Sequence, residues 1–112
     1  MSQLSAPAGS SPAATIHEAP CVPGGVRRGA ILTVAAAIAR RHQQQDNDIV
    51  VCGPDTIANR DQARVIEEAV RPCYHDGPHD RAGLYALPHW QQINPPPGGH
   101  SFYETTRTKA LS

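Results

Sequence analysis

The sequence predicts a small α+β domain, with two helices packed on a small, mostly antiparallel sheet and a disordered N-terminal tail. Two segments with apolar residues at helical spacing flank the short apolar run Ile49–Cys52, and the C-terminal third contains two strand-like segments. At 112 residues the chain is long enough for one domain. We therefore expect a tail over residues 1–25 and a folded domain over residues 26–112.

Residues 1–25 are dominated by Ser, Ala, Pro and Gly, and their few apolar residues show no period. Such a segment buries too little apolar surface to offset the entropy of ordering it, which predicts disorder. It also lacks the positively charged start of a secretory signal, so we expect the protein to be cytoplasmic as produced.

The uncharged run Gly29–Ala39 predicts the first helix, because its larger apolar residues recur at helical spacing. These residues are Ile31, Val34, Ala35 and Ile38. Crossing a bilayer takes roughly 20 apolar residues, and this run is much shorter, so we expect no membrane span.

Ile49–Cys52 predicts a buried strand, followed by a turn at Gly53–Asp55 and the second helix. Asn59 is a suitable N-cap with Gln62 three residues later, and Pro72 ends the helix. The predicted apolar stripe consists of Ala63, Ile66, Ala69 and Val70. A phosphate-binding loop is excluded here, since the segment has neither a glycine-rich loop nor a following Lys-Ser or Lys-Thr pair.

After Pro72 the sequence predicts a polar loop, Cys73–Gly83, and then a hairpin. Leu84–Ile93 and His100–Thr106 form its strands, and the Pro- and Gly-rich segment Asn94–Gly99 joins them. We expect the polar residues after Thr106 to be frayed.

Four of the six histidines lie between His75 and Glu104, together with the single Trp and the single Phe. Because residues two apart share a face of a strand, His89 and His100 can become neighbours across the hairpin. Tyr103 and Thr105 lie on the other face of their strand from His100.

One interpretation of this histidine cluster is general acid–base cleavage of RNA, since two imidazoles can accept and donate a proton near neutral pH. His89 and His100 would be the catalytic pair, while Arg81, Tyr103 and Thr105 are candidates for stabilising the charge on phosphorus. Trp90 or Tyr85 could stack on a base. The ten acidic and ten basic residues balance, so RNA binding would depend on a local site rather than on net charge.

Two other interpretations remain open. His75 and His79 could be loop ligands of a metal, joined by His89 or His100 and by Asp76 or Asp80, although Gly77-Pro78 prevents them from sharing a helix. The histidines could also be surface residues around a small aromatic core. The three cysteines form no C-x-x-C pair, and we do not expect a thiol nucleophile among them.

The segments "HDGPH", "LPHW" and "GGHSFYE" resemble the C-terminal toxin domains of bacterial polymorphic toxins, which rearrangement-hotspot and filamentous-haemagglutinin-type effectors carry. The resemblance covers about Asp48–Thr106 and implies a small, metal-independent nuclease without a cofactor. It also implies that His89 and His100 are catalytic, that His79 is an accessory substrate-binding residue, and that a cognate immunity protein is a partner. A domain of this kind would be delivered to the cytoplasm of a target cell.

The leading hypothesis is therefore a toxin-like nuclease that acts on RNA. Its catalytic residues would be His89, His100 and Tyr103, and its substrate-binding residues His79, Arg81, Trp90 and Thr105. The alternative is a non-catalytic, histidine-rich module that binds a metal or another protein.

Overall fold

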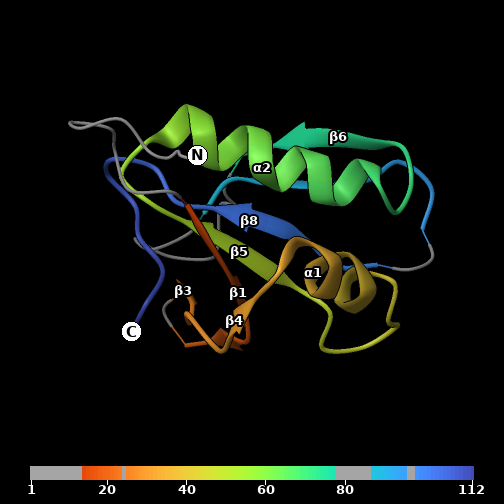
Figure 1. The fold of residues 1–112 in the computed structure, drawn as a ribbon, viewed down its shortest axis with the longest axis horizontal. Helices are drawn as coiled ribbons and strands as arrows, with labels where there is room; N and C mark the ends of the chain where they lie inside the picture. Colours follow the sequence, from red (N-terminus) through yellow and green to blue (C-terminus); the bar gives the residue numbers. More distant parts are fainter. Residues whose placement is uncertain (1–13, 24, 78–86, 96–97) are drawn as a thin grey trace, which may run out of the picture.

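The computed structural model describes residues 14–23, 25–77, 87–95 and 98–112 and has an α+β fold, as predicted (Figure 1). Its two helices and eight strands follow one another in the order β1 (Thr15–Glu18), β2 (Cys21–Val22), β3 (Gly25–Val26), β4 (Ile31–Leu32), α1 (Val34–Arg41), β5 (Ile49–Cys52), α2 (Thr56–Glu68), β6 (Cys73–Asp76), β7 (His89–Gln92) and β8 (Ser101–Tyr103).

Six of the strands form one sheet in the order β4-β1-β5-β8-β7-β6. The central pair, β5 and β8, is parallel, and the other four pairs are antiparallel, which confirms the prediction of a mostly antiparallel sheet. The remaining two strands, β2 and β3, form a separate antiparallel pair.

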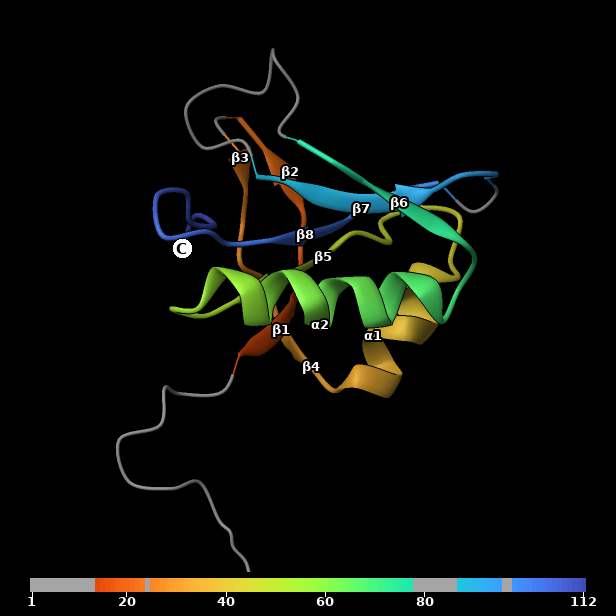
Figure 2. The ribbon, with the colours of Figure 1, turned by 90° about the horizontal axis from the view of Figure 1, so that it is seen from above.

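The helices cover one face of the six-stranded sheet, and the β2–β3 pair lies on the other face (Figure 2). The alternation of side chains along β5 divides the core accordingly. Ile49 and Val51 pack with residues of α1 and α2, while Val50 and Cys52 pack with Val26 and other residues on the opposite side. The apolar run that predicted a buried strand is thus buried on both faces, as expected for a central strand.

The predicted tail over residues 1–25 is wrong from Thr15 onward, because β1 is an inner strand of the sheet. β1 pairs with β4 on one side and with β5 on the other, and Ile16 is buried in the core. Hydrogen bonding to two neighbouring strands orders this segment in spite of its low hydrophobicity, since its backbone groups are satisfied by distant parts of the chain. Residues 1–13 of the predicted tail lie outside the described residues.

The first helix begins five residues later than predicted, because Thr33 caps it. The Thr33 hydroxyl accepts a hydrogen bond from the Ala36 N–H at 3.1 Å, and Ile31–Leu32 forms strand β4 instead. Ala37 is buried at the helix interface, whereas Val34 is exposed.

Among the described residues, no helix is long and apolar enough to cross a membrane.

The second helix is capped by Asp55 rather than by Asn59. The Asp55 carboxylate accepts hydrogen bonds from the N–H groups of Ile57 and Ala58 at 3.0 and 3.1 Å. Asn59 is buried inside the helix, where its amide joins two chain segments by donating to the carbonyls of Gly53 and Glu104. Of the predicted stripe, Ala63 and Ile66 are fully buried, whereas Ala69 and Val70 lie beyond the end of α2 and are not buried, because the helix already ends at Glu68.

The predicted loop Cys73–Gly83 begins with a strand, β6, that pairs antiparallel with β7 at the edge of the sheet. The antiparallel pairing of the predicted hairpin is confirmed, with His89 opposite Phe102, but β7 begins only at His89 and β8 spans only Ser101–Tyr103. The expected fraying of the C-terminus is wrong, since Leu111 exchanges backbone hydrogen bonds with Val26 and Arg28.

A fully buried ion pair between Arg41 and Glu67 connects the two helices to the sheet. The guanidinium donates to both carboxylate oxygens at 2.8 and 2.7 Å and also to the Gly98 carbonyl at 3.0 Å, while the Ser101 hydroxyl donates to Glu67 at 2.7 Å. Gly99 adopts φ of 98° beside this pair, and a Cβ there would lie 2.8 Å from Nη1 of Arg41. Glycine is therefore required at this position.

We expect Arg41→Ala to lower the free energy of unfolding by about 3–5 kcal/mol, because it leaves the Glu67 carboxylate buried without its partner. Arg64→Ala is the control, since its ion pair with Glu68 is half-exposed and such pairs contribute roughly 0–1 kcal/mol. Urea unfolding measures both. Equal losses in the two variants would contradict the central role of the buried pair.

Candidate functional site

The sheet separates the predicted catalytic residues onto two faces. His89 lies opposite Phe102 in the β7–β8 register, on the face away from the helices, whereas Trp90 lies opposite Ser101 on the helix face. Tyr103 shares the helix face with Trp90 and packs in the core beneath α1 and α2. The predicted group of His89, His100 and Tyr103 therefore does not form one site.

His89 and His100 are neighbours, which the predicted hairpin allowed. Their ring centroids lie 4.6 Å apart with the rings nearly perpendicular. His89 has 0% of its surface exposed, and its Nε2 lies 2.8 Å from Oε1 of Gln91 and 3.7 Å from the Asp76 carboxylate. A side chain with no exposed surface cannot exchange a proton directly with an RNA strand in this conformation.

His100 is held by Asp48 at the start of β5. The backbone N–H of His100 donates to Oδ1 of Asp48 at 2.6 Å, and the His100 ring nitrogen Nδ1 lies 3.4 Å from the same oxygen. Burial by itself raises the pKa of Asp48, but hydrogen bonds and charge from His100, with a smaller effect of the Arg41 charge, lower it overall. The carboxylate is thus stabilised in its ionised form.

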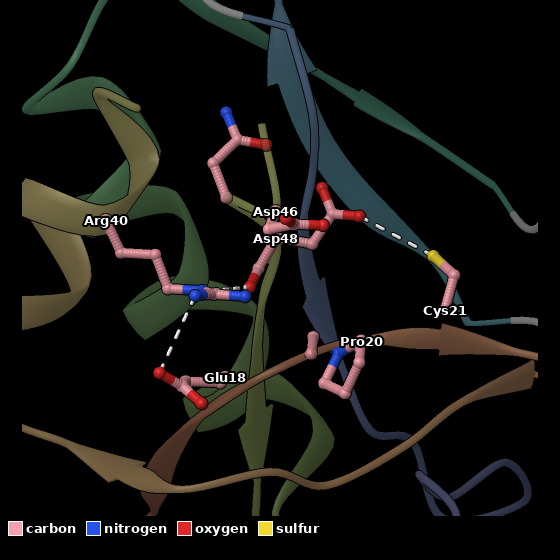
Figure 3. A pocket seen from close by; sticks show the side chains of 8 residues that line it. Glu18, Pro20, Cys21, Arg40, Asp46 and Asp48 are labelled. Carbon is pink, nitrogen blue, oxygen red and sulfur yellow. Dashed lines mark hydrogen bonds and ion pairs between the residues drawn. The ribbon is translucent and has the colours of Figure 1, made fainter. Parts of the chain in front are cut away.

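Asp48 also lines a pocket of about 340 Å³, which we call the Asp48 pocket (Figure 3). Its lining residues are Glu18, Ala19, Pro20, Cys21, Arg40, Asp46, Asn47 and Asp48. Three carboxylates face one guanidinium there, so the pocket repels a phosphate group. Partial burial and then the Asp48 charge raise the pKa of the Cys21 thiol, which disfavours a reactive thiolate at neutral pH.

A second pocket, of about 280 Å³, lies on the helix face between α2 and the β6–β7 edge of the sheet. We call it the α2 pocket, and it is lined by Arg60, Asp61, Arg64, His75 and Trp90. The two arginines are one helical turn apart, and His75 lies directly opposite Trp90 in the β6–β7 register. The lining contains two guanidinium groups and one carboxylate, and Glu68 pairs with Arg64 from outside it, so an anion in this pocket competes with Asp61 and Glu68 for the two arginines.

Trp90 lies on β7 and contacts two residues of α2 across the α2 pocket. Its indole N–H donates to the Arg60 carbonyl at 3.0 Å, and the Arg64 guanidinium lies over its ring at 5.2 Å from the centroid. The residue predicted to stack on a base thus bonds to the backbone of Arg60 and lies against the guanidinium of Arg64.

His75 is the ionisable side chain that β6 contributes to the α2 pocket. Its Nε2 lies 2.5 Å from the Tyr103 hydroxyl, and its ring contacts Trp90 edge-on at 5.0 Å. Burial raises the pKa of Tyr103, so its hydroxyl stays protonated at neutral pH. The sequence predicts a loop at His75, whereas the structure has strand β6 there, directly before Gly77.

The remaining predicted substrate-binding residues lie elsewhere. The Thr105 hydroxyl accepts from the N–H groups of Arg107 and Thr108 and bonds to the Thr108 hydroxyl, so it is engaged in a local turn. His79 and Arg81 lie outside the described residues. Within the described ranges, no group of three or more His, Cys, Asp or Glu side chains could hold a metal ion.

Comparisons of the chain with protein-family models, curated proteins and solved structures give no match. The resemblance to polymorphic toxin domains therefore stays a prediction.

The lowered pKa of Asp48 predicts a pH-dependent contribution to stability. Because its folded-state pKa lies below the ordinary value of 3.8, ionised Asp48 stabilises the fold above about pH 4, and this contribution is lost as the pH falls through the folded-state pKa. We expect Asp48→Asn to reduce the free energy of unfolding at pH 7 by about 1 kcal/mol, and by less near pH 3.

Urea unfolding at the two pH values tests this expectation. Asp46→Asn, at an exposed neighbouring position, is the control and should have little effect at either pH. A loss in Asp48→Asn that is as large near pH 3 as at pH 7 would show that the carboxylate charge is not responsible.

Proposed function

We propose that the chain is a small ribonuclease module that cleaves RNA by metal-independent transesterification in the α2 pocket. The observation that supports this proposal is the composition of that pocket. A carboxylate, an imidazole and two guanidinium groups line the same 280 Å³ space, namely Asp61, His75, Arg60 and Arg64. These are the types of group that general acid–base cleavage of a phosphodiester uses.

In the proposed reaction, Asp61 is the general base and takes the proton of the RNA 2′-hydroxyl. The 2′-oxygen then attacks phosphorus, and the bond from phosphorus to the 5′-oxygen breaks. Protonated His75 is the general acid and gives its proton to that leaving oxygen. The products are a 2′,3′-cyclic phosphate and a free 5′-hydroxyl, so no co-reactant is needed.

The two arginines supply the local positive charge that the balanced composition of the chain lacks. Arg60 lies 3.5 Å from Asp61, and Arg64 lies 2.8 Å from Glu68, with all four side chains about half exposed. Exposed pairs of this kind contribute roughly 0–1 kcal/mol, so a phosphate can replace the carboxylates at low cost. A guanidinium can also bind phosphate oxygens in a bidentate manner as charge builds up on them.

The α2 pocket supports this chemistry better than the pair of His89 and His100 does. His89 is fully buried, and His100 is bonded to Asp48 beside a pocket with three carboxylates. RNA is therefore still the proposed substrate, but the catalytic residues are His75 and Asp61 instead of His89 and His100.

We expect the purified chain to cleave a fluorescent single-stranded RNA and to leave DNA of the same sequence intact, since DNA has no 2′-hydroxyl. His75→Ala and Asp61→Asn should each lower the cleavage rate by roughly 100-fold or more, because each removes a proton-transfer group. His42→Ala, at an exposed position after α1, should cleave like the parent. Cleavage at the parental rate by His75→Ala would refute the assignment, and an inactive parent would refute the function.

The arginines are tested by binding rather than by cleavage. We expect Arg60→Ala and Arg64→Ala each to weaken binding of the uncleaved DNA strand. Each should also make the slope of log K against the logarithm of the salt concentration shallower by about 1, which corresponds to the loss of one phosphate contact. Arg71→Ala, at an exposed position beyond α2, is the matched control. Fluorescence anisotropy at several salt concentrations measures the slope, and an unchanged slope in both variants would exclude the α2 pocket as the phosphate site.

A further inference from the structure

We infer that Tyr103 is a positioning residue that keeps a proton on Nε2 of His75, so that Nδ1 is the nitrogen that exchanges protons with a ligand in the α2 pocket. The hydrogen bond is a property of the folded chain, whereas its catalytic consequence rests on the proposed function.

The position of Tyr103 is set by the core and not by the pocket. Its ring is 4% exposed and packs with Val51, Ala63 and Ile66 beneath the helices. Its hydroxyl reaches the more exposed His75 at 2.5 Å. The His75 ring lies between two aromatic neighbours, with its centroid 5.0 Å from that of Trp90 and 5.8 Å from that of Tyr103. A rigid group therefore orients a side chain that solvent and ligands can reach.

The protonation chemistry of imidazole determines the direction of this hydrogen bond in the charged form. An imidazolium ring has two donors and no acceptor, so its Nε2–H must donate to the Tyr103 oxygen. The phenol oxygen accepts this bond as a neutral group, since burial raises the pKa of Tyr103 and the hydroxyl keeps its own proton.

The same bond decides which proton leaves. When protonated His75 gives a proton to the leaving oxygen of RNA, the proton comes from Nδ1, because Nε2–H is held by Tyr103. The neutral ring that remains carries its hydrogen on Nε2 and still donates it to the Tyr103 oxygen. In the other neutral tautomer the Tyr103 hydroxyl would donate to a bare Nε2, and the spectrum of the parent distinguishes the two. Without the tyrosine hydroxyl, the neutral ring would divide between its two tautomers, and part of the population would carry the hydrogen on the wrong nitrogen.

The experiment reads the tautomer of His75 directly, by NMR of the full chain labelled with ¹⁵N-histidine, at a pH where the ring is neutral. The signal of His75 is identified by its loss in His75→Gln. We expect the parent to show the tautomer with hydrogen on Nε2, and Tyr103→Phe to show a mixture of both tautomers. Tyr74→Phe is the matched control, because its hydroxyl contacts Gln91 on the opposite face of the sheet.

A parent in which Nδ1 carries the hydrogen would overturn the inference, as would an unchanged tautomer in Tyr103→Phe. If Tyr103→Phe does not fold, the comparison is with exposed His42 in the parent: a larger Nε2 share at His75 supports the inference, and an equal share overturns it.

RNA cleavage by the same proteins separates this inference from the proposed function. We expect Tyr103→Phe to lower kcat by roughly 10- to 100-fold, as removing the partner that orients an active histidine typically does, with little change in KM. Parental kcat in Tyr103→Phe would overturn the catalytic part. If the parent holds the Nε2 tautomer but does not cleave RNA, the proposed function fails and the positioning of His75 stands.

Discussion

The fold depends on the buried pair of Arg41 and Glu67, because the two residues end or nearly end the two helices and meet under the sheet. Neither charge has any exposed surface, so each needs the other and its additional hydrogen bonds to offset the loss of water. Those bonds go to the Gly98 carbonyl and from the Ser101 hydroxyl. One interaction thereby sets the position of α1, of α2 and of the segment that enters β8.

The placement of α2 in turn produces the α2 pocket. Once Glu67 faces the core near the end of the helix, Arg60 and Arg64 lie on a side of the helix that borders β7, where Trp90 contacts both of them. The edge position of β6 then brings His75 to the same space. Glu67 and Arg60 are seven residues, or about two turns, apart, so the buried ion pair and the α2 pocket lie at different levels along neighbouring sides of the same helix.

The alternation of side chains in the sheet divides the histidine-rich C-terminal region into two environments. His89 and His100 lie on the face with Phe102 and near the carboxylates of Asp76 and Asp48, whereas His75 lies on the face of the helices near guanidinium groups. Residues of the same type within one stretch of sequence therefore have opposite electrostatic surroundings. Charge and exposure, rather than the number of imidazoles, favour the α2 pocket for chemistry on a phosphodiester.

The sequence by itself determined the α+β class, the buried strand Ile49–Cys52 and the buried positions Ala63 and Ile66 of α2, because these follow from local periodicity, and the hairpin allowed His89 and His100 to be neighbours without fixing their register. Tertiary structure decided that Thr15–Glu18 is an inner strand, that Asp55 rather than Asn59 caps α2, and that His75 meets Tyr103. These features depend on pairing and burial between segments far apart in the chain. Local patterns carry no information about such partners, and so the candidate site moved from two adjacent histidines to a pocket that only the packing of α2 on the sheet assembles.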